Sequence, residues 1–338
     1  MDHSFIIGPL PAIKATCKSP SAIDENCGKA NMLLTIIKSS LLLISTALVS
    51  SSPVPGKPLG GIPTVTIAPG VDMPLQGIGT WLYNSSRAES AVLTALKLTP
   101  TPYVHIDTAL IYGNQDGVGR ALKASGRDRK TYFLTTKIPG GLNASATQSS
   151  LEQDLALLQV SYVDLMLVHY PCTMDAKAAG GKASRQTMWK VMESFVKAGK
   201  ARAIGVSHYC QRHLQDVMDI ATIPIAVNQV QYHVGMGSPT TSGANATDNK
   251  AFCDRSGITY QSFSPLCGPC QDAKGNPDRS LILGKLVQSI GKKYGKSGAQ
   301  VSLKWQVQQG IPVVSFVVVA LVDMITAYPS VLLFVCCV

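Results

Sequence analysis

Short apolar runs alternate with longer amphipathic stretches along the chain, from about residue 62 onward. The short runs are rich in Val, Ile and Tyr, which is typical of buried strands. Eight candidate strands lie at 74–81, 103–108, 131–137, 163–170, 201–207, 225–233, 257–264 and 310–317. Helical spacing of apolar positions occurs between them, at 88–98, 117–125, 146–159, 187–198, 211–220, 247–255 and 281–294. The pattern predicts an α/β protein.

Strands that alternate with helices form βαβ units and a parallel sheet. Eight such repeats over about 250 residues predict a (β/α)8 TIM barrel. We expect the last β/α unit to be incomplete or divergent, because the residues after Gly310 are apolar on every side and not amphipathic. A doubly wound sheet is the alternative. That fold requires G-x-G-x-x-G after its first strand, and "GIGTW" at 77–81 does not match.

Two apolar segments lie outside the strand–helix repeat, one near each end of the sequence. They divide the chain into an N-terminal extension at 1–62, a barrel at 63–316 and an apolar tail at 317–338. Segment 32–52 resembles a secretory signal that begins at Met32. If it is one, the protein enters the secretory pathway or associates with a membrane; otherwise we expect it in the cytoplasm. Sequons at Asn84, Asn143 and Asn245 are compatible with secretion.

Composition narrows the classes of partner. The formal charge is +10, but Lys and Arg are scattered and do not form a basic run. We therefore expect no nucleic-acid partner and a monomer that binds a small molecule; a membrane would be contacted only through the terminal apolar segments. The nine cysteines do not suggest a disulfide framework or a metal site. "CGPC" at Cys267–Cys270 leaves a thiol-redox protein as a weaker hypothesis.

Polar residues follow three consecutive candidate strands, where barrel enzymes place their catalytic groups. They are Asp107, Lys137 and His169, with Tyr112 in the loop after Asp107. A nearby Lys⁺ would lower the pKa of a tyrosine, and a carboxylate would hold that Lys in place. Each residue alone has a structural explanation, such as a helix cap or a surface charge. Their joint placement indicates a tyrosine that protonates an oxyanion.

Successive blocks of the chain resemble the aldo-keto reductases. They read "YVHIDTALIYGNQDGVGRAL", "FLTTKIP", "DLMLVHYP", "KARAIGVSHY", "VNQVQYH" and "SFSPL", in order between about Val71 and Pro312. The resemblance implies a (β/α)8 barrel that reduces an aldehyde or ketone with NADP(H) or NAD(H). It implies a catalytic tetrad of Asp107, Tyr112, Lys137 and His169, with Tyr112 as general acid.

The same resemblance implies the binding residues. Those expected at the cofactor are Gly79, Thr80, Trp81, Ser207, His208, Gln229, Phe263, Ser264 and Leu266. Trp81 and Tyr170 are also expected to line the substrate pocket. The chain departs from the family pattern at four positions: Phe263 replaces a usual Tyr, His208 an Asn, Gln115 a Glu and Cys267 a Gly.

The tail departs further. The family continues after "GIPV" with a Lys-Ser…Arg segment that holds the adenosine phosphate, whereas Lys304 is the last Lys or Arg here. The tail is interpreted as a membrane anchor, a divergent last helix or a product of altered splicing or reading frame. The alternative to an active reductase is therefore a catalytically impaired barrel that acts as a binding or regulatory protein.

Overall fold

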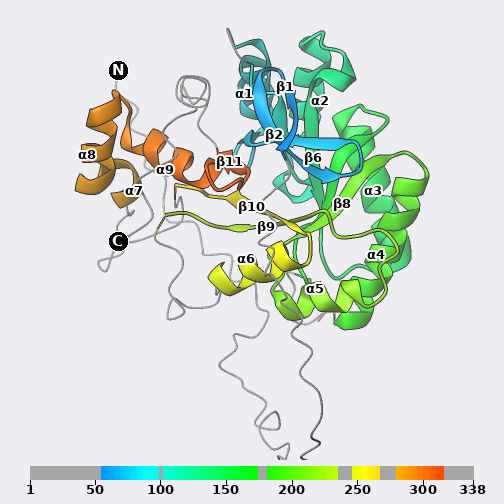
Figure 1. Ribbon diagram of the computed structural model, residues 1–338. Coiled ribbons are helices and arrows are strands. Elements are labelled where there is room, and N and C mark those ends of the chain that lie inside the picture. The colour runs from blue at the N-terminus through cyan, green and yellow to red at the C-terminus, as the bar shows by residue number, and fades with distance from the viewer. Residues whose placement is uncertain (1–54, 99–101, 174–180, 235–245, 267–278, 316–338) are drawn as a thin grey trace, which may run out of the picture.

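The computed structural model describes residues 55–98, 102–173, 181–234, 246–266 and 279–315 (Figure 1). The predicted signal segment 32–52, the Asn245 sequon, the Cys267–Cys270 motif and the tail 317–338 lie outside the described residues. Of the described cysteines, Cys210 and Cys253 are free thiols and Cys172 is disulfide-bonded. Within this described part, no helix is long and apolar enough to span a bilayer.

Eight parallel strands form a closed barrel, which confirms the predicted fold. In chain order they are β4 (Gln76–Gly79), β5 (His105–Asp107), β6 (Phe133–Ile138), β7 (Val163–Val168), β8 (Ala201–Ser207), β9 (Val227–Gln231), β10 (Thr259–Phe263) and β11 (Val313–Ser315). The eighth strand is present, because β11 pairs with β10 on one side and with β4 on the other. Any divergence of the last unit therefore follows the strand.

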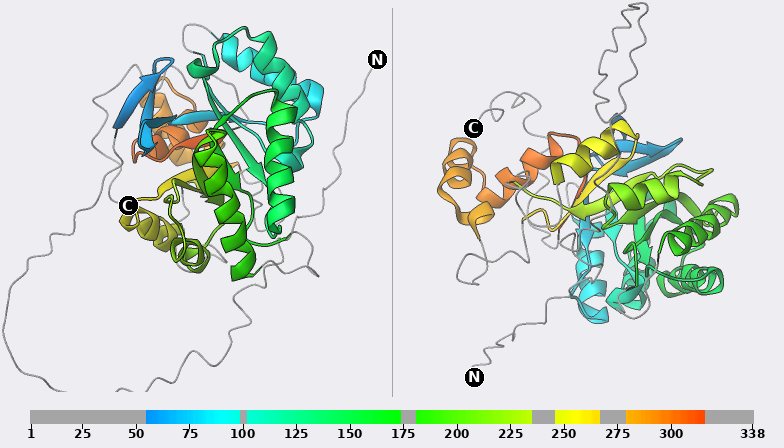
Figure 2. Two further views of the ribbon diagram at one scale, coloured as in Figure 1. Left: turned by 90° about the vertical axis from the view of Figure 1, so that its right-hand side faces the viewer. Right: turned by 90° about the horizontal axis from the view of Figure 1, so that it is seen from below.

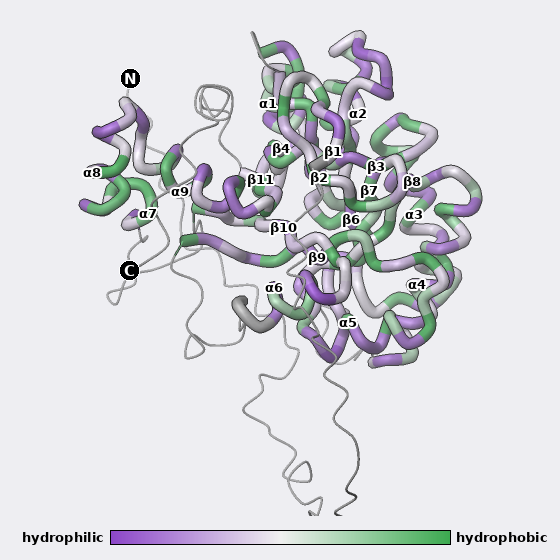
Figure 3. Tube along the Cα trace, in the orientation of Figure 1, coloured by the Kyte–Doolittle hydropathy of each residue, from purple (hydrophilic) through white to green (hydrophobic). Residues whose placement is uncertain are grey.

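Helices surround the barrel. They are α1 (Ser85–Lys97), α2 (Gln115–Ala124), α3 (Ala144–Leu158), α4 (Lys182–Lys197), α5 (Gln211–Met218), α6 (Ala246–Arg255), α7 (Ser280–Leu283), α8 (Lys285–Tyr294) and α9 (Gly298–Val307). Short 3₁₀ helices lie at Leu110–Tyr112 (η2) and Arg129–Thr131 (η3). Hydrophobic and hydrophilic residues alternate along outer helices such as α4, as an amphipathic pattern requires (Figure 3). Figure 2 shows α7, α8 and α9 (orange) on a different side from α3 and α4.

The helix ends follow from local sequence. Asn84 and Asn143, both in sequons, are the N-caps of α1 and α3, and each side chain accepts from the backbone N–H three residues later. The predicted helix at 281–294 is two helices, since the chain breaks at Gly284. The sequence analysis missed α9, although Ser297 and Gln300 form a capping box at its start.

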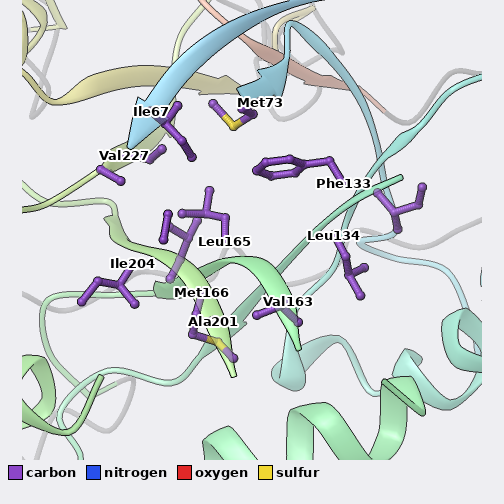
Figure 4. Close-up of a cluster of buried hydrophobic side chains, with 14 of the residues drawn as sticks. Ile67, Met73, Phe133, Leu134, Val163, Leu165, Met166, Ala201, Ile204 and Val227 are labelled. Atoms are coloured by element: carbon purple, nitrogen blue, oxygen red, sulfur yellow. The ribbon is translucent and has the colours of Figure 1, made fainter. Parts of the chain in front are cut away.

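A small antiparallel sheet at the amino-terminal end of the barrel was also not predicted. It consists of β1 (Pro55–Leu59), β2 (Ile62–Ala68) and β3 (Val71–Pro74). Its buried residues Ile67 and Met73 lie next to the first residues of barrel strands, Val227 and Phe133 (Figure 4). This contact covers the amino-terminal opening of the barrel with apolar side chains. Strand β1 belongs to the stretch 1–62 that was expected to be an extension.

Candidate active site

The four predicted catalytic residues come together at the carboxyl-terminal end of three neighbouring strands. Asp107 is the last residue of β5, Lys137 lies near the end of β6, and His169 directly follows β7. Tyr112 ends the 3₁₀ helix η2 that follows β5. Parallel register brings them together, because β5 pairs with β6 and β6 with β7. The joint placement expected from the sequence is therefore present.

A buried ion pair forms the centre of the site. The Lys137 ammonium donates to Asp107 Oδ1 and, at 3.0 Å, to the backbone oxygen of Thr108. The other oxygen of Asp107 accepts from Gln229 Nε2 at 2.7 Å. Asp107 and Lys137 are only 3% and 1% exposed. Because each charge has an opposite charge and further hydrogen bonds, the pair is held in place in a dry environment.

Tyr112 is the third member of this network. Lys137 Nζ lies 3.4 Å from the Tyr112 hydroxyl oxygen and 5.2 Å from the ring centroid. The expected lowering of the Tyr112 pKa is nevertheless wrong. Burial raises the pKa of Tyr112 well above its usual value, and the Asp107 carboxylate and Tyr170 add to this effect. The Lys137 charge does not lower it, since Asp107 neutralises that charge at closer range. Tyr112 is therefore a protonated donor at neutral pH.

His169 is a neutral imidazole. Burial lowers its pKa well below the usual value, and the charge of Lys137 and the neighbouring His208 add to the shift. Its ring stands edge-on to Tyr112, with 5.6 Å between centroids. His169 Nδ1 is buried and has no hydrogen-bond partner among the described residues. A neutral imidazole beside the tyrosine can exchange a hydrogen bond with an oxygen that binds there.

Four aromatic rings form a cluster at the site. His169 stacks on Tyr170 at 4.6 Å, Tyr170 on His208 at 4.4 Å, and His208 lies 4.8 Å from Phe263. The His169 and His208 rings are 5.9 Å apart, so Tyr170, expected to line the substrate pocket, contacts two histidines that also lie near each other. Trp81, the other expected pocket residue, is half-buried just after β4. Burial lowers the pKa of His208 to about 4, so the cluster is uncharged at neutral pH.

The predicted cofactor residues lie around the same rim. Ser207 ends β8, and its hydroxyl is 2.9 Å from His208 Nδ1. Gly79 ends β4 and pairs with Asp107, while the Thr80 amide and hydroxyl both donate to the Asp107 backbone oxygen. Gln229 contacts Asp107 directly. Ser264 and Leu266 follow β10; Ser264 is buried, with φ of 48°, and Leu266 packs partly against the core.

Asn114 is a site residue that the sequence analysis did not single out. Its buried side-chain amide donates to the backbone oxygens of Thr80 at 2.7 Å and Tyr83 at 2.9 Å. It thereby ties the loop after β4 to the segment that carries Tyr112. The signal was available, because Asn114 lies two residues beyond Tyr112 in a quoted block.

An open depression of about 490 Å³ lies elsewhere, lined by Lys130, Tyr162, Gly199 and Arg202. These residues precede or begin strands β6 to β8, so the depression is at the end of the barrel opposite Tyr112. It holds none of the predicted catalytic groups, and the tetrad therefore defines the candidate site. No group of three potential metal ligands occurs within the described ranges.

Comparison with known proteins agrees with this geometry. A family profile described as "Aldo/keto reductase family" matches residues 76–327. The chain is 34% identical over 250 residues to the glyoxal reductase of Bacillus subtilis, covering 73% of this chain and 80% of that protein. It is 33% identical over 262 residues to the yeast (Saccharomyces cerevisiae) glycerol 2-dehydrogenase (NADP(+)), covering 71% and 78%.

Solved structures give the same result. The crystal structure of an aldo/keto reductase from Brucella melitensis superposes with a TM-score of 0.63 at 30% identity, covering 75% of this chain and 87% of that one. The profile match includes most of the chain and all four positions predicted to be catalytic. The chain therefore belongs to the aldo/keto reductase family of NAD(P)H-dependent oxidoreductases.

Proposed function

We propose that this protein reduces an aldehyde or ketone to an alcohol, with Tyr112 as the general acid and NAD(P)H as the hydride donor. The observation that carries the proposal is the buried Asp107–Lys137 pair next to a protonated Tyr112. A catalytically impaired binding protein would have no need for this arrangement, in which a buried ion pair contacts a phenol that has a neutral histidine beside it.

Tyr112 has the proton that the reaction requires. Hydride addition to a carbonyl carbon leaves an alkoxide, which is a much stronger base than a phenolate. The Tyr112 O–H bond breaks as the new O–H bond of the alcohol forms, and Lys137, 3.4 Å away, stabilises the resulting phenolate. A raised pKa in the resting site is compatible with this role, because it keeps the proton on Tyr112 until the alkoxide develops.

His169 and Tyr170 would position the substrate. The neutral imidazole lies on one side of Tyr112, so a carbonyl oxygen that accepts from the Tyr112 hydroxyl would also be near the His169 ring. Tyr170 and the half-buried Trp81 offer aromatic surface for an apolar substituent. We infer a hydrophobic carbonyl substrate; the named glyoxal reductase supports an aldehyde within this class.

The rim residues fit a nicotinamide cofactor, which would supply the hydride. Ser207, His208 and Gln229 bear the hydroxyl, imidazole and amide groups that can hold a carboxamide, and Phe263 provides a ring face for stacking. His208 itself now lies against Phe263. A nicotinamide that stacks on Phe263 would therefore replace His208 in this contact. The name of the yeast relative supports NADP(H).

Cofactor preference is expected to be weak. A 2′-phosphate is normally selected by charged contacts from Lys or Arg, and none occurs in the sequence after Lys304. Isothermal titration of the full chain with NADPH and with NADH tests this expectation. Similar dissociation constants for the two would support it, and a strong preference for NADPH would show that another cation binds the phosphate.

The proposal is tested with Tyr112→Phe. NADPH oxidation in the presence of nitrobenzaldehyde should fall by about 10²–10⁴-fold, as expected for a lost general acid. NADPH binding, followed by fluorescence, should stay nearly unchanged. Tyr162→Phe is the matched control, because Tyr162 lies at the opposite end of the barrel. Full turnover in Tyr112→Phe, or equal losses in the two variants, would exclude Tyr112 as the acid.

A further inference from the structure

A closed polar cluster lies behind the catalytic strand, on the helix side of β6. Its members are Asp154 on α3, Thr136 on β6 and Gln115 on α2, which are 0%, 0% and 1% exposed. The Thr136 hydroxyl donates to Asp154 Oδ1 at 3.0 Å and accepts from Gln115 Nε2 at 2.5 Å. The Gln115 amide also lies within hydrogen-bond range of the Asp154 carboxyl, and this contact and that of Thr136 lower the pKa of Asp154 against the larger opposite effect of burial. Three elements thus meet through one hydrogen-bonded set.

Two buried atoms of this cluster lack a partner in the described part of the chain. They are Asp154 Oδ2 and Gln115 Oε1. If Asp154 is ionised, both atoms are acceptors and neither can satisfy the other. Turning the Gln115 amide over lets Nε2 donate to the carboxylate but still leaves one acceptor unsatisfied, because the single Thr136 proton can then reach only one of Gln115 Oε1 and Asp154 Oδ1. Unsatisfied buried acceptors are rare in native proteins, so a further proton is the simplest explanation.

The charges near Asp154 do not favour ionisation strongly. Within the described ranges, Lys137 on β6 is the cation that acts on its carboxyl, and that ammonium donates to Asp107 on the inner side of the strand. The charged residues of α2 are at the surface, where Arg120 pairs with Asp116 and Glu89. On α3 itself Glu152 pairs with Lys200. On α4, Arg185 pairs with Asp216, and Lys190 with Glu193.

We propose that Asp154 is a neutral carboxylic acid in the folded protein at mildly acidic pH and that its Oδ2–H then donates to Gln115 Oε1. The hydrogen bonds then form a complete ring: Gln115 to Thr136, Thr136 to Asp154, and Asp154 back to Gln115. All polar atoms of the cluster are satisfied in this state. Burial agrees with it, since desolvation raises the pKa of Asp154 to about 7.

The ring joins the segments that carry the proposed catalytic residues. Gln115 opens α2, three residues after Tyr112, and Thr136 precedes Lys137 on β6. The contribution of this ring to the stability of the fold depends on pH. Because the pKa of Asp154 is higher in the folded than in the unfolded protein, the contribution is complete below pH 3.8 and is lost as the pH rises through about 7. The ring is therefore a pH-sensitive joint between α2, α3 and β6.

The experiment compares the full chain with Asp154→Asn in urea unfolding from pH 5 to pH 8. The asparagine amide keeps the donor to Gln115 and the acceptor from Thr136 but does not titrate. We expect the unfolding equilibrium constant of the wild type to rise relative to the variant by about 10²-fold between pH 5 and pH 8 as the acid ionises. Asp154→Asn should be the more stable protein at pH 8. An infrared band of a protonated carboxyl at pH 5.5 should be lost in the variant.

Glu152→Gln is the matched control on the exposed side of the same helix, where the side chain is 44% exposed. It should retain the wild-type pH dependence. Parallel pH profiles for the wild type and Asp154→Asn, or the same infrared band in both, would show that Asp154 is ionised and would overturn the proposal. Neither readout requires the chain to be an active reductase.

Discussion

Two buried carboxylates, on barrel strands that are separated only by β6, lie at opposite ends of the barrel and are held in different ways. Asp164, near the start of β7, accepts from Arg129 at 2.6 Å, Arg202 at 2.7 Å and the Leu134 amide at 2.9 Å. Asp107, at the end of β5, accepts from one Lys and one Gln. Arg129 is fixed further, since its guanidinium lies 4.1 Å from the Tyr162 ring centroid.

The difference shows how one strand pattern provides both stability and chemistry. At the amino-terminal end the planar guanidinium groups make several fixed hydrogen bonds, and no titratable proton donor is engaged. At the carboxyl-terminal end the Lys137 ammonium has an N–H left that reaches the Tyr112 hydroxyl. Barrel enzymes generally separate stability and catalysis between these two ends. The predictions below test this separation, in order of decreasing effect.

Lys137→Met should damage both stability and activity. The variant leaves Asp107 as a buried carboxylate without its cation, which typically costs about 3–5 kcal/mol of unfolding free energy. It also removes the group proposed to stabilise the Tyr112 phenolate, so turnover per folded molecule should fall by about 10²-fold or more. Urea unfolding and NADPH oxidation measure the two effects. Normal turnover in the folded fraction would make Lys137 a structural residue only.

Asp164→Asn should reduce the stability of the fold but not the turnover of the folded protein. The variant leaves Arg129 and Arg202 near each other without the negative charge that compensates them. We expect the unfolding free energy to fall by about 3 kcal/mol at low ionic strength, at the lower end of the range for a broken buried pair, because both arginines are partly exposed to solvent. Turnover of the folded fraction should match the wild type, because the change is at the far end of the barrel. A large loss of turnover without loss of stability would contradict the separation of the two ends.

Buried histidines at both ends should make the fold sensitive to acid. Burial lowers the pKa of His105 at the start of β5 and of His169 at the site, and it lowers the pKa of His208 and of His213 to about 4 each. A lowered pKa means that the unfolded chain binds the proton first, so stability is complete above pH 6.5 and falls as the pH drops toward 4. Each value of about 4 corresponds to a ~10²-fold change in the unfolding constant. Equal urea midpoints at pH 7 and pH 5 in the Asp154→Asn variant, which lacks the opposite effect of Asp154, would contradict this.

The barrel could be predicted from sequence because its signals are local and repeated. Most strands lie in short runs rich in apolar residues, and each α-helix except α9 lies within a few residues of its predicted position. Helix α9 was missed because its apolar positions are weakly segregated, although its capping box was readable. The sheet β1–β3 was missed because its role depends on contacts with strands far along the chain.

The candidate site was predicted by residue type and position, but not its electrostatics. The position of Lys137 after an apolar run could be read directly. The direction of the Tyr112 pKa shift could not, because it depends on how close Asp107 lies to the same ammonium and on how dry the site is. The buried ring of Asp154, Thr136 and Gln115 was likewise hidden. A carboxylate on a helix normally indicates the solvent side, and its burial is a property of the assembled barrel.

Barrel closure has a consequence for synthesis of the protein. Strand β4 is completed early, but its second neighbour β11 pairs with it through Ser315 and Ile78, about 240 residues apart in the chain. During translation one edge of β4 therefore stays without its partner until nearly the whole barrel has left the ribosome. Unpaired edges of this kind attract other chains. Nascent chains that pause before β11 should depend on chaperones, whereas chains that contain β11 should not.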